Sequence, residues 1–200
     1  ENASQALRAE LAIPLSASVI GYVGRLSPIK GLDYLVDAFA QIRSSRPEAY
    51  LLLVGPVLGY QENFARLQQQ VNELGISKYV VFLLDQRDTP AAFQIMDLVV
   101  LPSIVPEGLG LVILEGLASG KPVIATNHGG PVEILTGCAA GRLVPPRDAK
   151  ALAETVEEIL SLSAERRQAL SVEARCWAVK RFGIERMMGE LVNVYNMVLD

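Results

Sequence analysis

The sequence predicts an α/β fold: a Rossmann-like parallel sheet with helices on both faces. Short apolar runs rich in Val, Ile and Leu alternate along the chain with longer amphipathic stretches. The runs are continuously apolar, as in strands that are covered on both faces. Of the 200 residues, 50% are hydrophobic and 20% charged, which is enough for one core without disulfides or a structural metal. Such alternation implies right-handed crossovers and therefore parallel strands.

The predicted elements follow one another in a regular order. The strands are the apolar runs at 18–24, 49–54, 80–84, 98–101, 122–125 and 142–144. The helices are 31–45, 62–74, 89–95, 110–119, a short helix containing Glu133, 149–162, 164–180 and 184–199. In the first of these helices apolar residues recur at helical spacing: Leu32, Leu35, Val36, Phe39 and Ile42.

The chain divides into three parts. Residues 1–17 are polar with several alanines and predict a helix or a linker between domains. Residues 18–182 hold the alternating pattern and form the domain. Residues 183–200 form a last helix that no strand follows.

Composition excludes several classes of protein. The net charge of −4 lacks the basic excess of a nucleic-acid-binding surface. Two separate cysteines and one histidine do not make a zinc site, and the cysteines fit a reducing cytoplasm. No apolar run is long enough to span a bilayer, and the first residues do not resemble a signal peptide.

In an open parallel sheet, ligands bind outside the carboxyl ends of the strands. The loops after Gly24, Val54, Leu84, Leu101 and Ala125 are therefore the places to search for a site.

The first of these loops runs from Gly24 to Gly31 and carries Arg25 and Lys30 just before a helix. A planar guanidinium, a compact ammonium and a helix N-terminus together can neutralise a diphosphate. A surface turn with two solvated cations is the other interpretation of this loop. The glycine spacing is not that of the dinucleotide-binding fingerprint.

The second loop follows the strand at 98–101 and leads through Glu107, Gly108, Leu109 and Gly110 into an apolar helix. The backbone N–H groups around residues 109–112 can hold a phosphate. Glu115 lies inside this apolar helix, where an unpaired carboxylate is costly to bury. Ligand hydroxyls would supply its partner, and a structural ion pair or a solvated helix face is the alternative.

The third loop, at 126–131, contains His128 and the pair Gly129-Gly130. A lone loop histidine is more often a surface residue than a catalyst. The two glycines indicate a close approach of the backbone to a ligand.

Together these pieces resemble the family-4 (group 1) retaining glycosyltransferases, which have the GT-B fold. The matching residues span about 18–145: Gly24-Arg25, Lys30-Gly31, Pro102-Ser103, Glu107, Glu115, Ala118, Gly120, the strand at 122–125, Gly129-Gly130 and Glu133. The resemblance covers the donor-binding half of that fold. It implies that the acceptor-binding N-terminal domain lies outside this chain and that the last helix crosses to it.

The resemblance also implies roles for residues. Arg25 and Lys30 would hold the donor diphosphate and neutralise the leaving group, with help from Gly24 and from the backbone of Gly108, Leu109, Gly110 and Leu111. Glu115 would bind the ribose, Glu107 would face the transferred sugar, and Leu84 with Asp85 would frame the base. The donor is then a nucleotide diphosphate sugar, and neither metal nor cofactor is expected.

The chain departs from the family pattern at three places. Leu109 stands where Phe is usual, Gly116 where Ala is usual, and Leu83-Leu84 where a glycine is common. The last departure leaves the choice among uridine, guanosine and adenosine donors open.

The resemblance further implies an acceptor sugar or lipid, held by the other domain, and no nucleic-acid partner. The whole protein is expected in the cytoplasm, associated peripherally with the inner face of the membrane where the acceptor is a lipid. Two alternatives stay open. One is a nucleotide-sugar epimerase of the same fold, which the single histidine disfavours. The other is a non-catalytic nucleotide-sugar-binding module.

Overall fold

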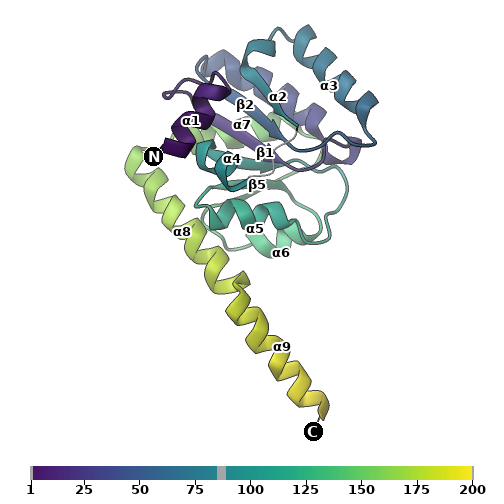
Figure 1. Cartoon of the computed structure of the whole chain (residues 1–200), viewed down its shortest axis with the longest axis vertical. Helices are drawn as coiled ribbons and strands as arrows, with labels where there is room; N and C mark the ends of the chain where they lie inside the picture. Colours follow the sequence, from purple (N-terminus) through teal and green to yellow (C-terminus); the bar gives the residue numbers. More distant parts are fainter. Residues whose placement is uncertain (1, 85–88, 200) are drawn as a thin grey trace.

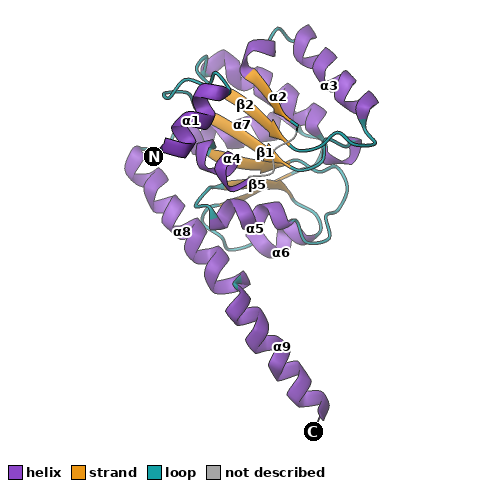
Figure 2. Ribbon diagram, viewed as in Figure 1, coloured by secondary structure: helices purple, strands orange, loops and turns teal. Residues whose placement is uncertain are grey.

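The structure, a computed structural model, describes residues 2–84 and 89–199. A twisted sheet forms its centre, and helices cover both faces (Figure 1, Figure 2). Helix α2 packs against α3 and α7 on one face, whereas α5 packs against α6 and α8 on the other. The predicted α/β fold with a parallel sheet is confirmed.

The observed elements lie close to the predicted ranges. The strands are β1 (Val19–Val23), β2 (Tyr50–Val54), β3 (Val80–Leu83), β4 (Leu98–Leu101), β5 (Val123–Thr126) and β6 (Gly141–Val144). The α-helices are α1 (Asn2–Glu10), α2 (Leu32–Ser45), α3 (Gln61–Glu73), α4 (Thr89–Ile95), α5 (Leu111–Ala118), α6 (Gly130–Leu135), α7 (Ala149–Leu160), α8 (Ala164–Phe182) and α9 (Ile184–Leu199). Two short 3-10 helices occupy Pro28–Lys30 and Ser77–Tyr79.

The strand order decides where a ligand can bind. All six strands are parallel, in the order β3-β2-β1-β4-β5-β6. The chain moves outward in one direction from β1 to β3 and in the other from β4 to β6. The loops after β1 and β4 therefore diverge and leave a crevice at the carboxyl edge, which is where open α/β sheets bind ligands. These are the first and second loops of the sequence analysis.

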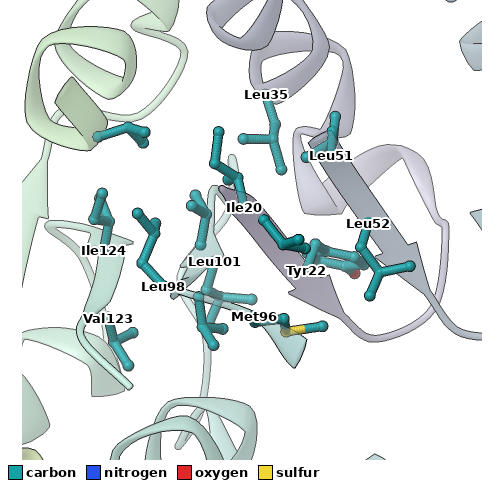
Figure 3. Packing of buried hydrophobic residues seen from close by; sticks show 14 of the residues in the cluster. Ile20, Tyr22, Leu35, Leu51, Leu52, Met96, Leu98, Leu101, Val123 and Ile124 are labelled. Carbon is teal, nitrogen blue, oxygen red and sulfur yellow. The ribbon is translucent and has the colours of Figure 1, made fainter. Parts of the chain in front are cut away.

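The core fills both faces of the sheet. Leu51, Leu52 and Leu53 of β2 are successive residues, and all three are fully buried. Adjacent side chains on a strand point to opposite faces, so such a run requires cover on both sides. Figure 3 shows Leu51 and Leu52 pointing to opposite sides of β2.

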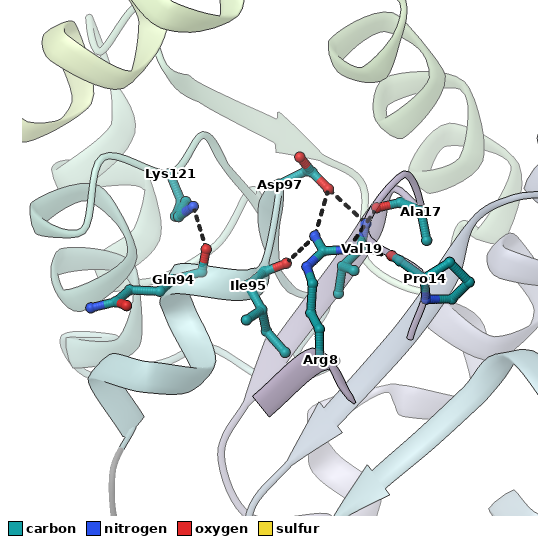
Figure 4. Close-up of polar contacts among 8 residues, drawn as sticks. All are labelled: Arg8, Pro14, Ala17, Val19, Gln94, Ile95, Asp97 and Lys121. Carbon is teal, nitrogen blue, oxygen red and sulfur yellow. Dashed lines mark hydrogen bonds and ion pairs between the residues drawn. The ribbon is translucent and has the colours of Figure 1, made fainter. Parts of the chain in front are cut away.

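Helix α1 is packed onto the domain at the amino edge of the sheet. Arg8 donates hydrogen bonds to the backbone carbonyls of Pro14, Ala17 and Ile95, at 2.9, 3.0 and 2.9 Å. Its guanidinium also lies 4.0 Å from Asp97, which accepts a hydrogen bond from the Val19 amide (Figure 4). Leu7 and Ile13 are buried in the same region. Residues 2–17 are thus attached to this domain, and the role of the segment at 1–17 as a connection to another domain stays a prediction.

The chain ends in two helices that extend away from the sheet (Figure 1). Helix α8 packs against α5, and Ala178 is its last buried residue. None of the described residues of α9 is buried, and many of its apolar side chains are exposed. Among residues 2–84 and 89–199, no helix is both long and apolar enough to cross a membrane. The predicted crossing of α9 to another domain stays a prediction.

Candidate functional site

A cavity of about 510 Å³ lies in the crevice between the first and second loops. Seven of the predicted site residues line it: Gly24, Arg25, Lys30, Glu107, Leu109, Gly110 and Leu111. Val23, Leu101 and Val112 complete the lining and supply its apolar part. Residues up to 89 positions apart are brought together because β1 and β4 are neighbours in the sheet.

The backbone of the first loop is held firmly where the loop leaves β1. The Gly24 amide donates to Val54 at 2.9 Å, and the Leu26 amide donates to Pro56 at 3.1 Å. The side-chain amide of Asn63 donates to the Leu26 carbonyl at 2.9 Å. The Arg25 side chain between these anchors is exposed and makes no hydrogen bond or ion pair with any residue that the structure describes. Its guanidinium is therefore free to bind an anion in the cavity.

Lys30 and Glu107 form an ion pair across the cavity. The Lys30 Nζ lies 2.5 Å from Glu107 Oε1, and only 15% and 17% of the two side chains are exposed. The Ser103 hydroxyl donates to the same carboxylate oxygen. Burial by itself would raise the pKa of Glu107, but the hydrogen bonds from Lys30 and Ser103 outweigh it, so the pKa is lowered. Glu107 is a carboxylate at neutral pH.

The N-terminus of α5 points its backbone donors at the same cavity. Gly110 precedes the helix with a φ of 75° and a ψ of 54°, a left-handed conformation that suits glycine. No side chain in the described part of the chain caps this end. The Ile113 amide donates to the Gly110 carbonyl at 2.8 Å. The earlier N–H groups of Leu111 and Val112 lack intrahelical partners and lie at the positive end of the helix dipole, so they suit an anion. The helix begins at Leu111, one residue later than predicted.

The third loop supports the second one instead of facing the cavity. His128 Nε2 lies 2.9 Å from the Ser103 carbonyl, which also accepts a hydrogen bond of 2.8 Å from the Thr126 hydroxyl. The Gly130 amide donates to the Glu107 carbonyl at 2.8 Å. A Cβ on Gly129 would lie 2.4 Å from that carbonyl oxygen. These two glycines thus admit the backbone of residues 107–109, and their close approach to a ligand stays a prediction.

Three predicted residues are absent from the described lining of the cavity. Leu84 follows β3, near the edge of the sheet, and is half-buried. Its predicted neighbour Asp85 lies outside the described residues. Gly108 packs its carbonyl against Gly130. Glu115 is exposed on α5, so the expectation of a buried carboxylate that needs a ligand there is wrong. Its contact with a ribose stays a prediction.

Two residues of the site had no assigned role in the sequence analysis. Ser103 was identified only as part of a motif, yet its hydroxyl and carbonyl connect Glu107 to the third loop. Tyr22 was one apolar residue of a strand, yet its hydroxyl contacts the first loop. The available signal was a polar group within two residues of a strand end. In the described part of the chain, no cluster of three His, Cys, Asp or Glu side chains suits a metal, and metal independence stays a prediction.

The sequence of this chain is similar to those of curated glycosyltransferases. It is 36% identical to a D-inositol 3-phosphate glycosyltransferase of Corynebacterium urealyticum over 200 residues, which are 98% of this chain and 46% of that protein. The chain thus spans about half the length of the curated relatives that it matches over nearly its whole extent.

Solved structures show the same likeness. HepE of Anabaena, in complex with UDP and glucose, matches with a TM-score of 0.88 and 30% identity, covering 98% of this chain and 52% of that chain. The C-terminal domain of a glycosyl transferase group 1 family protein from Francisella tularensis matches with a TM-score of 0.78 and 26% identity. The match covers 92% of this chain and 94% of that chain. The family model of the glycosyl transferases group 1 matches residues 3–177. With its parallel sheet and the two loops that flank the crevice, this chain belongs to the group 1 glycosyl transferases.

Proposed function

We propose that this chain is the donor-binding domain of a retaining glycosyltransferase that uses a nucleotide diphosphate sugar. One observation carries the proposal: the free guanidinium of Arg25, the ammonium of Lys30 and the uncapped N-terminus of α5 surround one cavity at the sheet crevice. All three are anion-binding groups. The complexes of HepE with UDP and with UDP-glucose support the same ligand class.

In this proposal the diphosphate lies between the two loops. Arg25 and the first N–H groups of α5 bind phosphate oxygens directly. Lys30 has three donors and uses one for Glu107, so two remain for the diphosphate. The ammonium can thus hold the carboxylate and a phosphate together.

These groups would also supply the catalysis. As the bond from the sugar to phosphate breaks, negative charge develops on the leaving diphosphate, and fixed cations and amide dipoles stabilise it. Glu107 is held as a carboxylate by Lys30 and Ser103 and is proposed to face the transferred sugar. Retention of configuration would follow from attack on the same face that the diphosphate leaves, with the phosphate assisting the acceptor hydroxyl. No metal or cofactor is required in this scheme.

The acceptor, a sugar or a lipid, is proposed to bind to a domain outside these 200 residues. The support is that the chain spans only about half of its curated relatives. A cytoplasmic enzyme with peripheral attachment to the membrane is the corresponding proposal for the whole protein.

Calorimetric titration of the 200-residue chain tests the proposal. UDP, GDP and ADP are titrated in buffer with excess chelator, and then again with magnesium. We expect at least one of them, with UDP the first choice, to bind with the same affinity in both buffers. Binding that appears only with magnesium would contradict metal independence, and no binding in either buffer would overturn the proposed function.

A further inference from the structure

The hydroxyl of Tyr22 lies directly beneath the first loop of the site. Tyr22 is fully buried in β1, and Figure 3 shows its ring among the aliphatic side chains of the core. Its Oη donates a hydrogen bond of 2.7 Å to the Arg25 carbonyl. A tyrosine in a core normally finds a partner for its hydroxyl. Here that partner is the backbone of a residue in the cavity wall.

This contact matters because the loop begins with a flexible residue. Gly24 has a φ of 149°, in a region that residues with a side chain rarely adopt, and a Cβ there would lie 2.8 Å from Tyr22 Oη. The strand geometry of β1 therefore does not by itself fix the peptide plane that follows. Gly24 and Leu26 are anchored to the β2 loop through their amides. The Arg25 carbonyl is anchored by the Tyr22 hydroxyl.

The direction of the Arg25 side chain is not fixed by a polar contact of its own. The side chain is exposed and has no hydrogen-bond or ion-pair partner among the described residues, so its direction follows from its backbone. The peptide unit after Arg25 is held at two points, by the Leu26 amide on Pro56 and by the Tyr22 hydroxyl on the Arg25 carbonyl. Without the second contact the unit can pivot about the first, which would shift the Arg25 Cα and move the guanidinium relative to the α5 amides.

We propose that Tyr22 is a positioning residue: its hydroxyl fixes the backbone of Arg25 and thereby aims the guanidinium at the donor diphosphate. This inference rests on the proposed function, because it takes Arg25 to be a phosphate ligand.

The protonation state of Tyr22 is suited to this role. Burial raises the pKa of Tyr22 far above its usual value of 10.0, and the nearby carboxylate of Glu107 raises it further. The hydroxyl therefore keeps its proton at neutral and moderately alkaline pH and stays a donor to the carbonyl.

The test is Tyr22→Phe, which keeps the ring and removes only the donor. The affinity of the 200-residue chain for UDP is measured by calorimetry, and that for uridine by NMR titration. We expect UDP to bind about three- to tenfold more weakly and uridine to bind unchanged, because the loss of one hydrogen bond corresponds to a factor of that order. Tyr50→Phe, in a ring pair with Tyr79 at the opposite edge of the sheet, is the matched control and should change neither affinity.

A double-mutant comparison separates positioning from general destabilisation. In an Arg25→Ala background, Tyr22→Phe should have no further effect on UDP affinity, since no guanidinium is left to position. If Tyr22→Phe weakened the binding of UDP and uridine equally, or weakened UDP binding equally with and without Arg25, Tyr22 would have a merely structural role. Either result would overturn the proposal. Unchanged UDP binding by Tyr22→Phe would overturn it as well, with the proposed function intact. If the wild-type chain binds no nucleoside diphosphate, the proposed function fails and this inference fails with it.

Discussion

Lys30 connects the two loops of the site, because its backbone belongs to the first loop and its ammonium contacts Glu107 of the second. Lys30→Ala therefore has two effects: it removes a cation from the diphosphate, and it leaves the carboxylate of Glu107 unpaired beside it. We expect the loss of UDP affinity to exceed that of Arg25→Ala, for which about 1.5–3 kcal/mol is typical of a charge-assisted contact. Calorimetry on both variants measures the difference.

The two effects can be separated by a second substitution. Glu107→Gln in the Lys30→Ala background removes the repulsion and should restore part of the UDP affinity. Lys78→Ala, an exposed lysine in the 3-10 helix before β3, is the control and should bind UDP normally. No restoration by Glu107→Gln would show that the carboxylate is too far from the diphosphate to repel it.

Glu107 should also make stability depend on pH. The folded protein lowers the pKa of Glu107 below the ordinary value of 4.5. Such a group stabilises the fold above that value and loses its contribution as the pH falls through the folded pKa. The difference in unfolding free energy between wild type and Glu107→Gln should thus shrink as the pH falls below 4.5 in urea denaturation. Glu48→Gln, an exposed glutamate, should show no comparable trend.

Glu115 offers a test of the ribose contact that the family resemblance implies. The side chain is exposed and makes no hydrogen bond or ion pair with the described residues, so Glu115→Ala should leave the melting temperature unchanged. If Glu115 binds the ribose, the variant should lose affinity for UDP more than for 2′-deoxy-UDP. An unchanged preference for ribose, measured by calorimetry with both ligands, would remove Glu115 from the site.

The exposure of Glu115 shows what a sequence reading of single residues misses. The helix is apolar overall, which suggested burial on all sides. Leu111 is 63% exposed, however, and Glu115 stands four residues later on the same helix face. Which face turns outward depends on tertiary packing, and here Ile113 and Leu117 face the core. Likewise, the ion pair of Lys30 with Glu107 requires β1 and β4 to be neighbours, and the sequence contains no local signal for that.

At the scale of elements, the sequence predicts most of the fold because the strands are buried on both faces. Their apolar runs end within one residue of the strand ends: β4 spans the predicted range, and β2 begins one residue later than predicted. The loops of the site could be found because glycines and charged residues follow those ends directly. The packing of α1 was missed, since nine mostly polar residues contain little periodic signal.

Helix α1 yields a prediction about stability. Arg8 is 13% exposed and binds three backbone carbonyls and Asp97, so Arg8→Ala removes several partners at once. We expect a loss of about 1–3 kcal/mol in the free energy of unfolding. UDP affinity should stay unchanged, because this cluster lies at the amino edge of the sheet, opposite the cavity. Arg186→Ala, which breaks an exposed ion pair with Glu190 on α9, should lower the free energy of unfolding only slightly, as measured by urea denaturation.

For the molecule as a whole, binding and transfer should be separable. The 200-residue chain contains the proposed donor cavity, and the positioning of an acceptor, which supplies much of the rate acceleration, would lie elsewhere. We expect it to bind UDP-glucose without transferring the sugar, as measured by product mass with candidate acceptor sugars and lipids. Efficient transfer by this chain alone would contradict the division of work between two domains.

The extended α9 has a consequence for cooperativity. With none of its described residues buried, this 16-residue helix gains almost no free energy from the folding of the sheet. Helices of that length are only marginally stable in water by themselves. On heating, α9 would therefore unwind gradually, ahead of the domain. The helical circular-dichroism signal and the fluorescence of Trp177, which packs on the domain, would follow different melting curves. The fluorescence of Trp177 would report the unfolding of the domain alone. The helical signal would report two events, the unwinding of α9 and the unfolding of the domain.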